Sequence, residues 1–136
     1  KGHLVFSVTP EDTVLDALRL MAEKNIGAVM VMEGNHVEGI FSERDYARRG
    51  ILMGNSEKTK IKEVMSTTVY FISPDESLES CLTQMSDRRV RHLPVVSEGR
   101  VTGVISIGDV VKAIIAEKQA TITGLENFLV SKDNPL

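Results

Sequence analysis

The hydrophobic residues of this chain follow two kinds of spacing, which alternate along the sequence. In residues 9–25 and 73–89, apolar side chains recur every three or four positions, after a hydroxyl residue, a proline and acidic residues. This arrangement is typical of an amphipathic helix and its start. Two short apolar runs separated by a polar turn follow each segment, namely 28–32 with 37–41 and 93–96 with 101–105. Each half of the chain therefore predicts a helix followed by a β-hairpin.

The remaining segments complete the same pattern. Apolar runs at 5–8 and 69–72 predict a strand before each helix, and second helices are expected from Glu43 and Ile107. Each half then has the order β-α-β-β-α. The polar stretch 51–68 predicts a connection with a short helical segment, and the charged stretch after residue 116 predicts a further helix and a loose end. The expected units are residues 1–60 for the first repeat with its linker, 61–118 for the second repeat, and 119–136 for the C-terminal helix and tail.

The two halves are copies of one unit. Residues 5–50 align with residues 69–114 without a gap, and nine of the 46 aligned positions are identical. The spacing Gly-x-x-Ser-x-x-Asp begins at Gly39 and, 64 residues later, again at Gly103. Two copies at a constant offset indicate a duplicated supersecondary unit.

One unit of this size is too small to bury both faces of a three-stranded sheet by itself. We therefore predict an α/β (α+β) fold in which two β-α-β-β-α repeats pack sheet to sheet with pseudo-two-fold symmetry. Such a pair has two equivalent clefts, where the strand ends of one repeat meet the helix starts of the other. Both Ser-x-x-Asp segments are expected there.

Composition argues against two kinds of partner. The chain has 16 Lys and Arg against 19 Asp and Glu, a net charge of −3, and no Trp, which argues against nucleic acid as the main partner. No apolar run approaches the ~20 residues that span a bilayer, so no membrane contact is expected. The single Cys81 aligns with Ala17 on an apolar helix face and is expected to be a buried thiol. A reducing, cytoplasmic compartment fits these features.

The repeated Ser-x-x-Asp has two interpretations. It is typical of a helix capping box, in which the Ser and the acid each satisfy a backbone N–H of the other residue. That interpretation does not explain the cationic cluster at 88–92, which leads directly into an apolar strand. Such clusters are usually solvated charge runs. Here we place part of the cluster at the rim of a cleft.

A nucleotide suits the chemistry of these residues. One Asp carboxylate can accept hydrogen bonds from both hydroxyls of a ribose cis-diol. A phosphate needs positive potential, which backbone N–H groups at the helix starts and Arg side chains can supply. An adenine ring needs apolar walls, which the short strands can provide through Val8, Ile40, Ile72 and Ile105.

The segments GIFSERD, VRHLPVV and GVISIGDVVKAII resemble the paired CBS domains, also called a Bateman module after their occurrence in proteins such as cystathionine beta-synthase. The resemblance spans about residues 5–115 and implies adenosine ligands in the clefts. It matches the Ser and Asp of each motif to ribose-binding positions, and Arg91 and His92 to phosphate-facing positions. The first repeat departs from it, because Gly27 and Ala28 stand where the second has Arg91 and His92. The two clefts are therefore expected to differ in charge.

The residues expected to bind nucleotide come from the motifs, the cationic cluster and the strands. They are Ser42, Arg44, Asp45, Ser106, Asp109, Arg89, Arg91, His92, Gly27, Ala28, Val8, Ile40, Thr67, Ile72, Pro94 and Ile105. The ligands that the resemblance implies are AMP, ADP, ATP, NAD(H) and S-adenosylmethionine. AMP or NAD(H) is favoured over ATP, because Glu43 beside Ser42 opposes additional phosphate charge.

These observations favour a regulatory module that senses an adenine nucleotide and modulates an unknown partner protein or its own oligomer. The layout resembles the stand-alone CBS-pair proteins of bacteria and plant organelles. We expect no enzyme activity, no metal and no catalytic cofactor, because no nucleophile, base or metal-ligand spacing is evident. A homodimer is expected through Val110, Val111, Ile114 and Ile115. The alternatives are a ligand-free oligomerisation module, an enzyme acting on a nucleotide, or a regulatory fragment of a larger enzyme.

Overall fold

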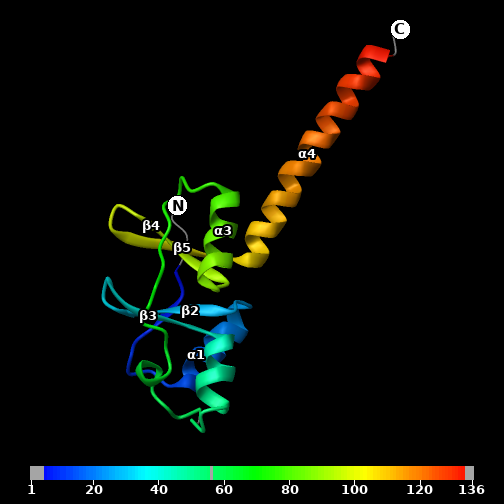
Figure 1. Ribbon diagram of the computed structural model, residues 1–136. Helices are drawn as coiled ribbons and strands as arrows, with labels where there is room; N and C mark the ends of the chain where they lie inside the picture. Colours follow the sequence, from blue (N-terminus) through cyan, green and yellow to red (C-terminus); the bar gives the residue numbers. More distant parts are fainter. Residues whose placement is uncertain (1–4, 56, 134–136) are drawn as a thin grey trace.

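The computed structural model describes residues 5–55 and 57–133, which form two small sheets with helices on their outer faces (Figure 1). The first repeat consists of β1 (Ser7–Val8), α1 (Val14–Lys24), β2 (Ala28–Glu33), β3 (His36–Ser42), α2 (Glu43–Asp45) and the π-helical turn η1 (Tyr46–Ile51). The connection contains the 3-10 turn η2 (Ile61–Glu63). The second repeat consists of α3 (Leu78–Arg88), β4 (His92–Ser97), β5 (Arg100–Ser106) and α4 (Ile107–Asp133). The duplicated α/β architecture expected from the sequence is confirmed.

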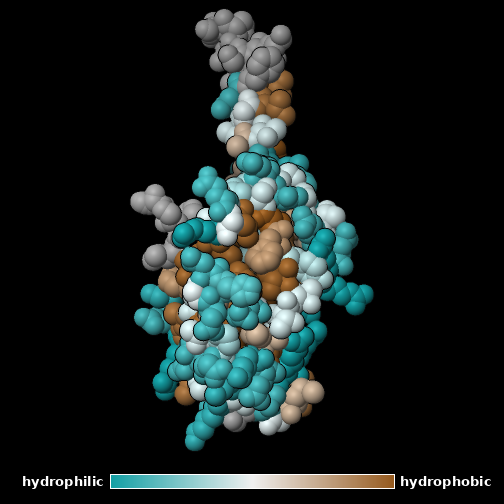
Figure 2. Space-filling model, turned by 90° about the vertical axis from the view of Figure 1, so that its left-hand side faces the viewer, coloured by the Kyte–Doolittle hydropathy of each residue, from teal (hydrophilic) through white to brown (hydrophobic). Residues whose placement is uncertain are grey.

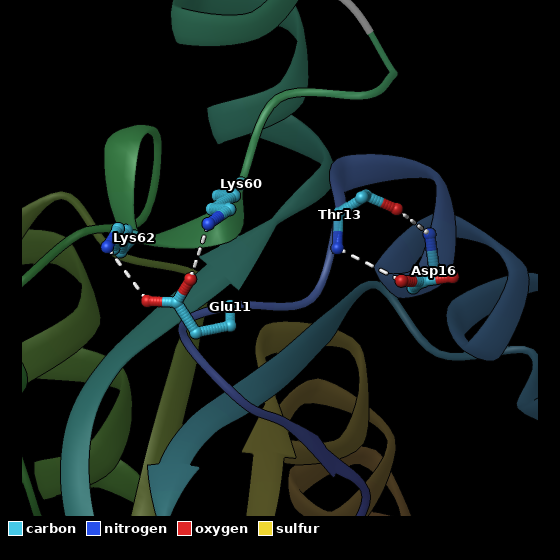
Figure 3. Close-up of polar contacts among 5 residues, drawn as sticks. All are labelled: Glu11, Thr13, Asp16, Lys60 and Lys62. Atoms are coloured by element: carbon cyan, nitrogen blue, oxygen red, sulfur yellow. Dashed lines mark hydrogen bonds and ion pairs between the residues drawn. The ribbon is translucent and has the colours of Figure 1, made fainter.

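The first helix of each repeat begins and ends in the same way. Thr13 and Asp16 form a capping box at the start of α1, with backbone-to-side-chain distances of 3.0 and 3.1 Å (Figure 3). Ser77 caps α3 by accepting a hydrogen bond from the backbone N–H of Ser80. Asn25 and Arg89 end the two helices in the left-handed conformation, with φ of 55° and 57°. The 64-residue offset thus holds in the backbone geometry as well as in the sequence.

The strand expected at 69–72 reduces to a single bridged residue, which corrects the prediction. Only Ile72 pairs with β4, in a parallel bridge to Val95. In the first repeat the backbone N–H of Met30 donates to Phe6 at 3.2 Å. Pro94 stands at the position equivalent to Met30 and has no N–H to donate. The ladder therefore cannot extend before Ile72, and the second sheet has two strands, β4 and β5.

Each repeat has its own hydrophobic core between its helices and one face of its sheet. The first contains Val14, Ala17 and Met21 from α1, and the second contains Cys81 and Met85 from α3. Cys81 is 2% exposed, as expected for a small core side chain, and burial raises the pKa of its thiol.

The connection is more than the polar linker that the sequence suggested. Ile61 and Val64, which the expected boundary assigns to the second repeat, are fully buried in the core of the first. The backbone N–H of Ile61 donates to Asp12 at 2.8 Å. Glu11 pairs with Lys60 and Lys62 at 2.7 and 2.8 Å (Figure 3), and these contacts hold its pKa at about 2. The connection therefore fastens onto the start of α1.

The last helix is longer than predicted. α4 continues without a break through residues 116–119, where the second unit was expected to end, and it projects from the repeats (Figure 1). The expected loose end at 134–136 lies outside the described residues. Val110 is buried and Ile114 packs against the second core, so only Val111 and Ile115 of the expected dimer face are exposed. Across residues 5–55 and 57–133, no helix combines the length and apolarity needed to cross a membrane.

Candidate functional site

Two cavities lie where the repeats meet, and we name them after the acid in each. The Asp45 cavity has a volume of about 330 Å³ and the Asp109 cavity about 270 Å³. The residues lining the first are Gly27, Ile40, Ser42, Glu43, Arg44, Asp45, Arg48, Arg49, Ser66, Thr68, Val69, Tyr70, Arg89, Val90, Arg91, His92 and Pro94. The residues lining the second are Val5, Phe6, Asn25, Ile26, Gly27, Ala28, His92, Val104, Ser106 and Asp109.

The two cavities are built by the same rule. Each takes the end of a hairpin strand and the following helix start from one repeat. From the other repeat it takes the segment before the first helix and the residues that lead into the hairpin. Val69 and Tyr70 thus correspond to Val5 and Phe6 at the offset of 64 residues. The structure therefore contains both clefts that the duplication predicted.

The Ser and Asp of each motif form a capping box. The backbone N–H of Ser42 donates to Asp45 Oδ2 at 2.9 Å, and the backbone N–H of Asp45 donates to Ser42 Oγ at 3.2 Å. Ser106 and Asp109 repeat these contacts at 2.9 and 3.1 Å. Within the described residues, both carboxylates make these contacts through Oδ2, and neither makes a hydrogen bond through Oδ1. Capping thus leaves one oxygen of each Asp for a ligand.

Charge distinguishes the cavities sharply. Five guanidinium groups line the Asp45 cavity, those of Arg44, Arg48, Arg49, Arg89 and Arg91. Of the described residues that line the Asp109 cavity, none is Arg or Lys. Arg44 also crosses between the repeats, because its Nη1 donates to the carbonyl of Arg89 at 3.2 Å. The Asp45 cavity is therefore the one with the potential to hold an anion.

Two of the five arginines were missed by the sequence analysis. Arg48 and Arg49 lie on the π-helical turn that follows α2, and Arg49 Nη1 donates to the carbonyl of Met65 at 2.9 Å. Gly50 permits this turn, because a Cβ there would lie 3.0 Å from the ring of Tyr46. The available signal was the pair itself, since Arg49 aligns with Ala113 in the second repeat.

His92 lies between the two cavities and lines both. Burial lowers the pKa of His92 below its usual value, while the carboxylates of Glu43 and Asp109 act in the opposite direction. A Cβ on Gly27 would lie 3.3 Å from His92 Nε2 and 3.3 Å from Glu43 Oε1, so the missing side chain leaves room for both. A proton is therefore gained at lower pH than an exposed imidazole would require.

Four residues expected at the clefts line neither cavity. Val8 and Ile72 are buried in the two cores, and Ile105 packs against the second core. Because successive strand residues face opposite sides, the apolar wall next to Ser106 is Val104, the true counterpart of Ile40. Thr67 is also absent, and its neighbours Ser66 and Thr68 line the Asp45 cavity instead. The aromatic walls, Tyr70 and Phe6, were not predicted.

Two fused β-α-β-β-α repeats, with a ligand-sized cavity at each junction, define a tandem-repeat module of the ligand-binding type. The CBS domain family matches residues 5–51 and 61–116. The chain therefore belongs to the CBS-domain family and contains a tandem pair of these domains.

Several proteins resemble the chain over most of its length. It is 35% identical over 127 residues to the mitochondrial CBS domain-containing protein CBSX3 of Arabidopsis thaliana, covering 89% of this chain and 62% of CBSX3. It is 34% identical over 105 residues to the CBS domain-containing protein YhcV of Bacillus subtilis, covering 77% and 75% of the two chains. The chain thus spans less than two thirds of the length of CBSX3.

Solved structures show the same fold. A putative signal-transduction protein with CBS domains from Burkholderia ambifaria has a TM-score of 0.81 and 45% identity, with 85% of each chain covered. A more distant CBS domain protein from Pyrobaculum aerophilum, complexed with AMP, has a TM-score of 0.70 and 18% identity, with 77% of this chain and 82% of that chain covered. The second likeness shows the fold alone.

Proposed function

We propose that this chain is a regulatory module that binds an adenine nucleotide, preferentially AMP, in the Asp45 cavity. The observation that carries the proposal is the combination, in one cavity, of an Asp with an uncommitted oxygen and five arginines. A ribose cis-diol can donate to the free Oδ1 of Asp45 while Oδ2 remains in the capping box. A phosphate can then take charge-assisted hydrogen bonds from the guanidinium groups.

The remaining walls suit an adenine ring. Ile40, Val90 and Pro94 are apolar, and Tyr70 supplies an aromatic face. Glu43 lies in the same lining and disfavours each additional phosphate. These features support AMP over ATP and leave NAD(H), ADP and S-adenosylmethionine as ligands to compare. A CBS domain protein complexed with AMP provides independent support for this class of ligand in the fold.

The proposed role is regulatory rather than catalytic. Binding would change the affinity for a partner protein, or the association of the chain with itself, as in any ligand-linked equilibrium. The Asp109 cavity lacks the cationic residues that a phosphate needs. We therefore propose one phosphate-dependent site for each chain, with the second cavity weaker for AMP.

Calorimetry with AMP and with adenosine tests this proposal. AMP should bind at one strong site per chain, and Arg91→Ala should weaken it about 10-fold at low salt, because four other arginines remain. The loss should shrink near 1 M salt, where screening is strong. Adenosine should be unaffected by the substitution.

The matched control is Arg100→Ala, because Arg100 lies in the same hairpin and lines neither of the two cavities. Two equal AMP sites, or equal losses in both variants, would contradict the assignment. Absence of any nucleotide binding would favour the ligand-free oligomerisation module. Chromatography of the nucleotide after incubation should recover AMP unchanged, and conversion of AMP would indicate an enzyme.

A further inference from the structure

The far half of α4 makes little use of the two repeats. Every described side chain from Ile115 to Asn127 is exposed, and the helix extends away from the sheets (Figure 1). Its near half is different, because Val110 and Ile114 pack into the second core beside α3. The helix therefore has one anchored end and one end without cover from the described chain.

The uncovered half has a sequence that does not favour a helix by itself. Thr121, Ile122 and Thr123 are β-branched, and Gly124 follows them. Such residues lower helix stability, and isolated helices shorter than ~12–15 residues are marginal in water. The helical state of this segment therefore requires a surface to pack against.

One face of the same segment is apolar. Val111, Ile115, Ile122, Leu125 and Leu129 are between 40% and 59% exposed. Their spacing follows the first and fourth positions of a seven-residue repeat, with Lys118 at the only charged position of the series. Figure 2 shows hydrophobic residues gathered along one side of the projecting helix. We call this series the α4 stripe.

We propose that the α4 stripe binds the α4 stripe of a second copy of this chain, with the two helices antiparallel. In the register that fits best, Ile115 of one copy lies level with Leu125 of the other, and Val111 lies level with Leu129. Lys118 then lies level with Ile122 and can extend its ammonium group past it into solvent. Every apolar member of the stripe is covered in this arrangement.

Charge selects the antiparallel orientation. Lys112 and Glu126 occupy the same flanking position of the repeat, 14 residues apart. In the antiparallel register each Lys112 comes within about 3 Å, along the axis, of the level of Glu126 of the other copy. A parallel pair would instead place the two Lys118 side chains against each other at the seam, which costs stability.

The anchored end does not obstruct this pairing. At about 100° per residue, Val111 and Ile115 point roughly a quarter turn away from Val110 and Ile114. The second helix would therefore lie beside α3 rather than displace it. The arrangement also leaves both cavities clear, since no member of the stripe lines either one.

Sedimentation of the wild-type chain and of Ile122→Glu tests the interface. The wild-type chain should be a dimer at micromolar concentration, and Ile122→Glu should weaken it roughly 100-fold or more, because the symmetric interface loses two buried isoleucines. Ala120→Glu is the matched control, since this residue lies on the opposite face of the same exposed segment. Circular dichroism should show that Ile122→Glu also lowers the helix content. A monomeric wild-type chain, or equal losses in both variants, would overturn the proposal.

A charge exchange tests the orientation. Lys112→Glu and Glu126→Lys should each weaken the dimer roughly 3- to 30-fold at low salt, because each converts two attractive pairs into two repulsive ones. The double variant K112E/E126K should restore the wild-type affinity to within a few-fold. Failure of the double variant to recover would refute the antiparallel register. Because these residues line neither cavity, AMP binding should stay unchanged in all of these variants, so the two proposals fail independently.

Discussion

The pair Asp45 and Asp109 allows the two roles of the Ser-x-x-Asp motif to be separated. Both carboxylates cap a helix with closely similar distances, 2.9 Å from the Ser backbone nitrogen in each repeat. Substitution of either by Ala should therefore cost a similar amount of folding stability, about 0.5–2 kcal/mol. Only the Asp45 cavity combines its acid with arginines. Asp45→Ala should thus lose AMP affinity, whereas Asp109→Ala should keep it.

The expected loss follows from the hydrogen bonds that the ribose would make. A hydrogen bond to a charged group contributes about 1.5–3 kcal/mol, so Asp45→Ala should weaken AMP roughly 10- to 150-fold. The assay is calorimetry with AMP and 2′-deoxy-AMP on the wild-type chain and both variants, with denaturant unfolding to measure the loss of the cap. The wild-type chain and Asp109→Ala should prefer AMP over the deoxy compound.

Discrimination between the two ligands is the decisive result. Asp45→Ala should bind both with nearly equal affinity, because the acceptor for the 2′-hydroxyl is gone. A general distortion of the cavity would weaken both ligands but keep their ratio. If Asp45→Ala still preferred AMP by the wild-type factor, the Asp would be a capping residue alone.

Two further predictions concern stability. Gly39→Ala should destabilise the fold by about 1–3 kcal/mol, because its Cβ would lie 2.6 Å from the Ser66 carbonyl oxygen of the connection, whereas Gly103→Ala, with open space at the equivalent position, should be nearly neutral in denaturant unfolding. His92 has a lowered pKa, so the unfolded chain takes up a proton below about pH 6.5 that the folded chain does not. The stability that the neutral imidazole contributes is then present above that pH and is lost as the pH falls through the folded pKa. Unfolding curves between pH 7.5 and pH 5 (~2.5 units) should be flatter for His92→Gln, and parallel curves would contradict this account.

The duplication carried most of the fold, because each expected helix and hairpin appeared at both copies of the offset. It failed where one repeat has a residue that changes backbone pairing. Pro94 in place of Met30 removes a donor and shortens the strand at 69–72, a difference that an alignment of classes does not reveal. The connection was also misjudged, because a short helical turn with two buried side chains, Ile61 and Val64, has too few residues to show a period.

The cavities were predictable in position and only partly in lining. The motif acids and the cationic cluster came from the sequence, and the structure brings Arg91 and His92 beside Asp45 as the offset implied. Ile105 was chosen where Val104 faces the cavity, an error of one residue that turns a strand side chain to the other face. Arg48 and Arg49 could not be placed, because their approach depends on a π-helical turn rather than on regular helical spacing.

One imidazole forms part of the wall of both cavities, so the contents of the two cavities are not thermodynamically independent. An anion beside the arginines stabilises the protonated, inward state of His92, and that state presents a different surface to the neighbouring cavity. By linkage, the factor by which the first occupant changes the affinity for the second equals the factor in the reverse direction. A duplication that began with two equivalent clefts has thereby become a pair of unlike sites that share one titrating group.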